Sequence, residues 1–278
     1  MARRSPLINV IVSAVMKASR TLRRDFGEVE QLQVSRKGPA DFVSMADKKA
    51  EETLFEELRH ARPDFGFLME EGGEVKGKRD DIRFIIDPLD GTTNFLHGLP
   101  HFAISVAVEE RGEITAAVTY APLNDELFWA EKGQGAYLND TRLRVSGRNK
   151  MEDALFATGI PFKGRGNHER FIAELEEFMP AIAGIRRFGS ATLDLAYVAA
   201  GRYDGYWEAD LQPWDVAAGI LLVREAGGYI TDMTGGTNIV KGGTVIAAND
   251  RLHAPMERLI KRVQRSMTKT DSLYLIHN

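Results

Sequence analysis

The residues that most clearly carry chemistry are Asp87 and Asp90, two acids in the sequence Asp-Pro-Leu-Asp-Gly-Thr-Thr-Asn-Phe. They stand where an apolar stretch is interrupted by Pro88 and followed by Gly91. Carboxylates this close repel each other unless a cation lies between them, and hard oxygen ligands suit Mg²⁺. The N–H groups of Gly91, Thr92 and Thr93, with the two threonine hydroxyls, can bind phosphate if a helix begins there. The segment predicts adjacent metal and phosphate sites. The competing interpretation is a plain turn, because Asp, Pro and Gly are common turn residues.

Further acids lie where a predicted strand ends or a predicted helix begins. Glu70 and Glu71 directly follow the apolar stretch 66–69, Asp215 stands in the expected first turn of an apolar helix, and Asp47 begins another helix. Each has a simpler explanation, because Glu is common in solvated loops and an acid at a helix start complements the helix dipole. The recurrence of acids at such junctions favours a metal site over an isolated turn.

The opening residues predict an amphipathic helix rather than a secretion signal. Ser5 suits the N-cap position and Pro6 the first helical position. A polar stripe would lie opposite an apolar one: Ser5, Asn9, Ser13 and Lys17 against Leu7, Ile8, Ile11, Val15, Ala18 and Leu22. The core of a signal peptide would instead be apolar on all sides.

The remaining pattern mixes strands and helices, which predicts a layered α/β fold. A helix is expected over 46–60 after a loop at 36–40, short strands at 66–69 and 83–86, and a β-rich middle from 101 to about 145. The rest is expected to alternate: strands near 154–158, 185–188, 203–208, 229–232 and 244–248, and helices near 168–179, 191–200, 213–226 and 251–263. The tail after Ser266 has little periodicity and is expected to be poorly ordered.

Composition narrows the class of protein. The chain has 278 residues, 44% hydrophobic and 27% charged, which is typical of a soluble globular protein. A net charge of −4 gives no reason to expect nucleic-acid binding, and no stretch predicts a membrane span. The absence of cysteine excludes a phosphocysteine mechanism and thiolate metal sites, and is compatible with the cytoplasm.

Taken together, the acidic motifs closely resemble those of the inositol monophosphatase family of metal-dependent sugar phosphatases. The resemblance is carried by three segments in family-like order, residues 69–71, 87–95 and 214–218. Supporting matches at 37–47, 189–191 and 203–208 extend it over residues 5 to about 265. The three acidic motifs are specific as a set, and any one alone is not.

The resemblance implies roles for individual residues. One Mg²⁺ would be held by Glu70, Asp87 and the Leu89 carbonyl, a second by Asp87, Asp90 and Asp215, and a third, where present, would also use Glu70. Thr92 and Asp47 would orient the attacking water, with Glu70 also counted among the catalytic residues. Gly91 and Thr92 would bind phosphate, and the polyol would face Asp90, Ser190, Ala191, Glu208 and Asp215.

The resemblance also implies a fold and an activity. We expect one layered α/β domain over 1–278, with most metal ligands in an N-terminal half (about 1–150), the Asp215 helix in a C-terminal half (about 151–265), and a tail at 266–278. The expected reaction is Mg²⁺-dependent hydrolysis of a small polyol phosphate, first myo-inositol 1-phosphate, by activated water without a phosphoenzyme. A lithium-sensitive homodimer is expected. Alternatives are fructose 1,6-bisphosphate, NADP, histidinol phosphate or a nucleotide bisphosphate as substrate, or a protein-binding role on the transcription machinery.

Some positions depart from the family pattern or stay open. Gly72 stands where many relatives carry Ser or Thr, and either Arg36 or Lys37 corresponds to a lysine of the family's mobile loop. Arg186 and Arg187 fit a second phosphate site, a subunit contact or an ordinary edge-strand surface. His97 and His101 lack a metal-ligand spacing and are expected to be structural or surface groups.

Overall fold

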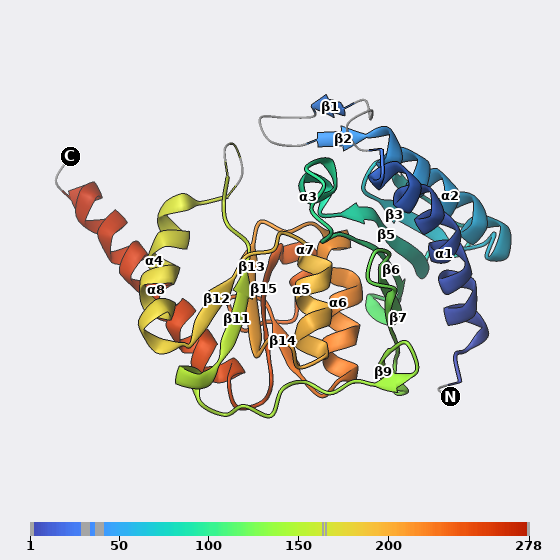
Figure 1. Ribbon diagram of the computed structural model, residues 1–278. Helices are drawn as coiled ribbons and strands as arrows, with labels where there is room; N and C mark the ends of the chain where they lie inside the picture. The colour runs from blue at the N-terminus through green and yellow to red at the C-terminus, as the bar shows by residue number, and fades with distance from the viewer. Residues whose placement is uncertain (1–2, 29–33, 37–41, 163, 165, 277–278) are drawn as a thin grey trace.

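The computed structural model describes residues 3–28, 34–36, 42–162, 164 and 166–276. Helices and sheets alternate in layers, which confirms the predicted layered α/β fold. Three buried apolar clusters occupy the spaces between these layers. In Figure 1, α5 (Ala191–Ala199) and α6 (Pro213–Glu225) lie between the two sheets, with α1 (Pro6–Phe26) and α2 (Met45–Ala61) at one side. The helices α4 (His168–Phe178) and α8 (His253–Ile276) lie at the other.

The larger sheet, eight-stranded in the described part of the chain, has the order β10-β9-β8-β7-β6-β5-β3-β4. Its strands are β3 (Gly66–Met69), β4 (Gly73–Val75), β5 (Ile82–Asp90), β6 (Ala103–Glu110), β7 (Glu113–Ala121), β8 (Glu126–Glu131), β9 (Gly135–Leu138) and β10 (Thr141–Arg142). β3 pairs with β5 in parallel, so both strands deliver their terminal acids to one edge of the sheet. The β-rich middle is confirmed.

The strand predicted at 83–86 was too short. β5 continues through Pro88 to Asp90, and its pairing with β6 shifts register between Asp87 and Asp90. Pro88 has no N–H to donate to the ladder, so an irregularity at this point is expected. The two acids therefore belong to the distorted end of a strand and not to a separate turn.

The smaller sheet has the order β12-β11-β13-β15-β14 among the described residues. Its strands are β11 (Leu155–Thr158), β12 (Gly184–Arg186), β13 (Gly205–Ala209), β14 (Tyr229–Thr231) and β15 (Thr244–Ala248). Each agrees with a predicted strand within a few residues, although β12 ends at Arg186 and not at Phe188. β12 is an edge strand. This agrees with the interpretation of Arg186 and Arg187 as part of an ordinary edge-strand surface.

The predicted helices are present. Ser5 caps α1 by accepting a hydrogen bond from the Ile8 N–H at 3.2 Å, and Pro6 begins the helix. The predicted apolar stripe is buried, for example at Ile8, Ile11 and Val15. The described residues also contain the short helices α3 (Thr92–Leu96) and α7 (Ile239–Gly242) and the 3-10 turns Met151–Asp153 and Met179–Ala181.

The last helix is longer than the sequence predicted. α8 does not end near residue 263 but continues as a helix to Ile276. Weak amphipathic periodicity does not prevent a helix from extending past the body that its first turns contact. None of the helices in the described ranges is long and apolar enough to cross a membrane.

The loop predicted at 36–40 lies almost wholly outside the described residues, as does Lys37. Its flanks form an antiparallel pair, β1 (Val34–Arg36) with β2 (Phe42–Ser44). β2 leads directly into α2, whose first turn carries Asp47.

Candidate active site

The end of β5 and the start of α3 form the centre of the site. Asp87 is 2% exposed, and its Oδ1 accepts a hydrogen bond from the Leu89 N–H at 3.0 Å. The Thr92 hydroxyl donates to the Leu89 carbonyl at 2.9 Å and lies 3.5 Å from Asp47 Oδ2. Gly91 precedes α3 with φ of 92°, and a Cβ there would lie 2.9 Å from the His101 carbonyl oxygen. Only glycine fits this junction without strain.

Four other acids share the electrostatic environment of Asp87. Burial raises the pKa of Asp87 well above its ordinary value, and the negative charges of Glu70, Asp90, Asp215 and Asp47 raise it further. The cluster therefore favours either protonation or a bound cation. The predicted acids, from four separate segments, are brought to one place.

The donor chemistry of this cluster fits a hard divalent cation. Carboxylate oxygens and a backbone carbonyl at Leu89 are the ligands that Mg²⁺ prefers. Within the described ranges, no three acidic or imidazole side chains already surround one point closely enough to hold an ion.

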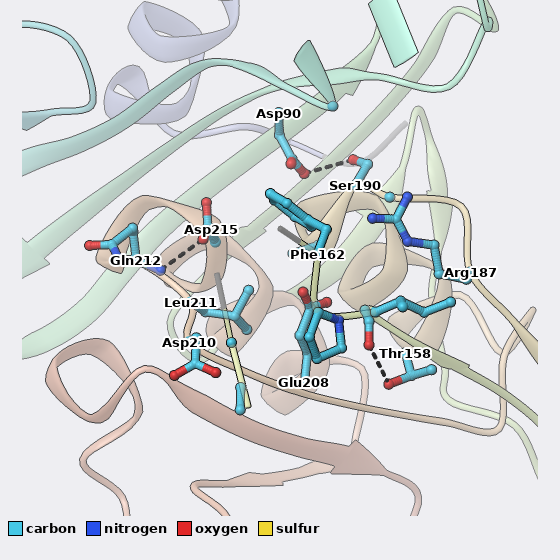
Figure 2. Close-up of a pocket in the computed structure, with 18 of the residues that line it drawn as sticks. Asp90, Thr158, Phe162, Arg187, Ser190, Glu208, Asp210, Leu211, Gln212 and Asp215 are labelled. Atoms are coloured by element: carbon cyan, nitrogen blue, oxygen red, sulfur yellow. Dashed lines mark hydrogen bonds between the residues drawn. The ribbon is translucent and has the colours of Figure 1, made fainter. Parts of the chain in front are cut away.

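Asp90 contacts the C-terminal half of the chain. Its Oδ2 accepts hydrogen bonds from the Ser190 hydroxyl at 2.6 Å, the Thr192 N–H at 2.8 Å and the Thr192 hydroxyl at 2.6 Å. Figure 2 shows Asp90 and Ser190 facing each other across the pocket wall. The Ser190 hydroxyl, expected to face a polyol, is therefore engaged by Asp90.

Asp215 has two roles in the geometry. It is in the first turn of α6, where its Oδ2 accepts a hydrogen bond from the Gln212 N–H at 2.7 Å. It also lines the pocket (Figure 2). The helix-start explanation of this acid is thus correct and does not compete with the site explanation.

Glu208, at the end of β13, is fixed from two sides. The Tyr206 hydroxyl donates to Glu208 Oε2 at 2.5 Å. Tyr206 is fully buried, and burial together with the charge of Glu208 raises the pKa of its hydroxyl. A Cβ on Gly159 would collide with the Glu208 carboxylate. The carboxylate of Glu208 therefore packs directly against the backbone of Gly159.

These residues surround one cavity of about 760 Å³. Asp47 is buried behind Thr92 and does not line the cavity. All the other predicted site residues line it: Glu70, Asp87, Leu89, Asp90, Gly91, Thr92, Ser190, Ala191, Glu208 and Asp215. At the far end, Arg170 pairs with Asp210 at 3.1 Å and lies 3.4 Å from Glu174.

Several contributors were not predicted from the sequence. Thr192, Tyr206 and Gly159 act on site residues, and Glu51 Oε2 accepts the Glu71 N–H at 2.8 Å, which holds the turn that carries Glu70. Glu51 lies one turn after Asp47 on α2, so its helical spacing was an available signal. The others depend on contacts between distant segments.

The open positions are now placed. A Cβ on Gly72 would lie 2.8 Å from the Met69 methyl and 3.1 Å from Glu51 Oε1. Arg187 lines the pocket, whereas Arg186 is exposed and its Nη1 donates to the Ile185 carbonyl at 3.0 Å. His97 is exposed, and His101 packs against the rings of Phe188 and Tyr197, where burial lowers its pKa.

Comparison with known proteins decides the family. The sequence profile of the inositol monophosphatase family matches residues 3–268. The chain belongs to this family. Members of the inositol monophosphatase family are phosphoric monoester hydrolases, and the family is generally metal-dependent.

Individual members are similar over most of their length. An inositol-1-monophosphatase of Rhizobium meliloti is 58% identical over 93% of this chain and 97% of its own. The Nus factor SuhB of Escherichia coli is 45% identical over 89% and 92%. The crystal structure of extragenic suppressor protein suhB from Bartonella henselae has a TM-score of 0.90 at 57% identity, covering 92% of this chain and 99% of that one.

Proposed function

We propose that the protein hydrolyses the phosphate ester of a small polyol in a Mg²⁺-dependent reaction, with myo-inositol 1-phosphate as the first substrate. The observation that carries the proposal is the gathering of Glu70, Asp90, Asp215 and Asp47 around the buried Asp87 in an open pocket. The name of the 58% identical Rhizobium meliloti protein supports the substrate.

We assign the cation to the predicted ligand sets. Glu70, Asp87 and the Leu89 carbonyl would hold one Mg²⁺, and Asp87, Asp90 and Asp215 a second, with Glu70 available to a third. When bound, Mg²⁺ would neutralise the phosphate charge and make a water molecule more acidic.

The protein's own groups would bind, orient and accept a proton. Gly91 and Thr92 would donate backbone N–H groups to the phosphate. The Thr92 hydroxyl, already directed at Leu89 and Asp47, would position the attacking water, and the carboxylates of Asp47 and Glu70 would accept its proton. Glu208, Ser190, Ala191, Asp90 and Asp215 would contact the polyol.

Phosphate release from a substrate panel tests this proposal. The panel is inositol 1-phosphate, fructose 1,6-bisphosphate, NADP, histidinol phosphate and adenosine bisphosphate, with Mg²⁺ or with EDTA. We expect Mg²⁺-dependent release, strongest from inositol 1-phosphate, that Asp90→Asn abolishes. Asp80→Asn, at an exposed acid, is the matched control and should keep full activity. A stronger preference for another ester would change the substrate, and no release from any of them would refute the proposal.

We also propose that water attacks phosphorus directly, without a phosphoenzyme. A chiral thiophosphate ester distinguishes the two routes, because one in-line displacement inverts phosphorus and two displacements retain its configuration. Inversion is expected. Retention would require a covalent intermediate on a residue that the proposal does not include.

A second function, binding to the transcription machinery, is favoured by one observation, the 45% identity to the Nus factor SuhB of Escherichia coli. It is compatible with catalysis. If binding matters to the cell, an Asp87→Asn chain should restore growth to a deletion strain, and a failure of this chain to do so would contradict the binding role.

We propose two further properties from the family resemblance, a homodimeric state and inhibition by lithium. The organisation of residues 1–278 as a single domain stays a prediction. A homodimer should sediment as a dimer at working concentration, and sedimentation as a monomer would contradict it. Lithium should inhibit by competing for a Mg²⁺ position, so inhibition should weaken as Mg²⁺ rises. Activity that is indifferent to lithium would contradict that proposal.

A further inference from the structure

One oxygen of Asp90 carries an unusual number of hydrogen bonds. The Ser190 hydroxyl, the Thr192 N–H and the Thr192 hydroxyl all donate to Oδ2, at 2.6, 2.8 and 2.6 Å. Ser190 is 1% exposed and Thr192 fully buried, so water does not compete for these groups. Hydrogen bonds to an ionised acceptor are stronger than neutral ones.

All three donors belong to the start of α5. Ser190 is the N-cap residue of α5, but its side chain does not cap the helix. Asp90 takes that place, because its carboxylate accepts the N–H of Thr192 in the first turn of α5. The first-turn N–H groups of a helix lack partners within the helix, and the helix dipole favours a negative charge at this end.

The arrangement fixes the direction of the carboxylate. With Oδ2 occupied, none of the hydrogen bonds in the described part of the chain reaches Asp90 Oδ1. Asp90 also raises the pKa of Asp87 through its charge, so the two carboxylates are electrostatic neighbours. A carboxylate held by one oxygen presents the other in a defined direction with little loss of side-chain entropy on binding a ligand.

We propose that Thr192 is a positioning residue for Asp90, which directs Asp90 Oδ1 toward the divalent cation of the proposed site. This inference rests on the proposed function. Thr192 touches neither substrate nor metal in this arrangement, and acts through Asp90 alone. The hydroxyl of Thr192 is the group that a substitution can remove while the backbone N–H stays in place.

Titration of the protein with Mn²⁺, followed by calorimetry and by the electron paramagnetic resonance of free Mn²⁺, tests the inference without relying on activity. Thr192→Val keeps the shape of the side chain and removes only the hydroxyl. We expect it to weaken Mn²⁺ binding about 10- to 100-fold, the usual effect of losing a group that orients a ligand. Thr192→Ser restores a hydroxyl and should return the affinity toward that of the wild type.

Thr119→Val is the matched control, because Thr119 is also fully buried and its hydroxyl has no hydrogen-bond partner in the described part of the chain. It should bind Mn²⁺ as the wild type does. Ser190→Ala removes a different donor to Asp90 and should weaken binding in the same direction. Thr192→Ala removes the same hydroxyl as Thr192→Val with a smaller side chain, so the test survives a Thr192→Val chain that fails to fold.

The outcomes separate the two proposals. Wild-type affinity in Thr192→Val, or in Thr192→Ala if the former does not fold, would overturn the role of Thr192 and leave the proposed function intact. A wild-type protein that binds no Mn²⁺ would remove the proposed function and this inference with it.

Discussion

At the scale of single residues, Glu208 offers a direct test of how the pocket recognises hydroxyl groups. Tyr206→Phe removes the hydroxyl that donates to Glu208 Oε2. A lost hydrogen bond to a charged group costs about 1.5–3 kcal/mol. We expect kcat/KM for inositol 1-phosphate to fall about tenfold or more, mainly through KM, with little change for p-nitrophenyl phosphate, which has no ring hydroxyls.

The control for this measurement is Tyr203→Phe. The Tyr203 hydroxyl is buried and has no hydrogen-bond partner among the described residues, so its removal should leave both substrates unaffected. An equal loss on both substrates in Tyr206→Phe would indicate general damage to the sheet and contradict a role in recognition.

Asp194, on α5, should make stability depend on pH. It is 1% exposed, and its pKa is raised well above the ordinary value by burial first and then by the charges of Glu208 and Asp90. Because the folded state holds this proton more tightly than the unfolded state, stability falls as pH rises from the unfolded pKa to the folded one.

Asp194→Asn should remove that dependence. We expect it to raise the free energy of unfolding at alkaline pH by about 1 kcal/mol, a usual size for one substitution, and to change it little at acid pH. Urea denaturation of metal-free protein at several pH values measures this. A variant less stable than the wild type at alkaline pH would show that the carboxylate is needed for packing.

The site acids could be predicted from the sequence because a carboxylate at the end of a strand or the start of a helix is a recognisable candidate metal ligand. Asp87 and Asp90 stand together at the end of an apolar stretch, and Asp215 stands at a helix start. Thr192 and Tyr206 carry no such signal, because each matters through a contact that only folding creates. Thr192 lies 102 residues from Asp90 along the chain.

At the scale of elements, the start of α1 is a feature that the sequence predicted in detail. Ser5→Ala removes the side chain that accepts the Ile8 N–H. We expect a loss of about 1 kcal/mol in the free energy of unfolding, the usual value of an N-cap. Ser5→Asp retains an acceptor and should stay close to wild type. Equal losses in both variants would contradict the capping role.

The ends of two elements, β5 and α8, differ from the prediction. β5 extends past Pro88 because β6 pairs with its backbone on both sides of this residue, at Asp87 and again at Asp90. α8 extends to Ile276 despite weak periodicity. Helix starts at Pro6 and Pro213 were predictable because proline and capping residues act within one turn. The end of β5 depends on its pairing with β6, which a local pattern does not contain.

At the scale of the whole molecule, the proposed cation site joins the larger sheet to the helix that packs between the two sheets. Asp87 and Asp90 belong to the larger sheet, and Asp215 lies on α6. Like charges from these parts repel across the pocket, as the raised pKa of Asp87 indicates. A cation that binds only the folded arrangement should therefore stabilise the entire fold, and not the pocket alone.

Mg²⁺ should accordingly raise the free energy of global unfolding. At a free concentration one hundred times its dissociation constant, a single site that exists only in the folded state contributes about 2.7 kcal/mol. Urea denaturation in Mg²⁺ and in EDTA at matched ionic strength measures the difference, with far-ultraviolet circular dichroism reporting both sheets.

Asp87→Asn should lose this stabilisation by Mg²⁺. Because the substitution also removes a destabilising buried charge, the metal-free variant should be at least as stable as the metal-free wild type. The exposed Asp80→Asn should keep the full response. An equal response in Asp87→Asn would mean that Mg²⁺ stabilises the protein at another place, and the acids around Asp87 would then lose their assigned role.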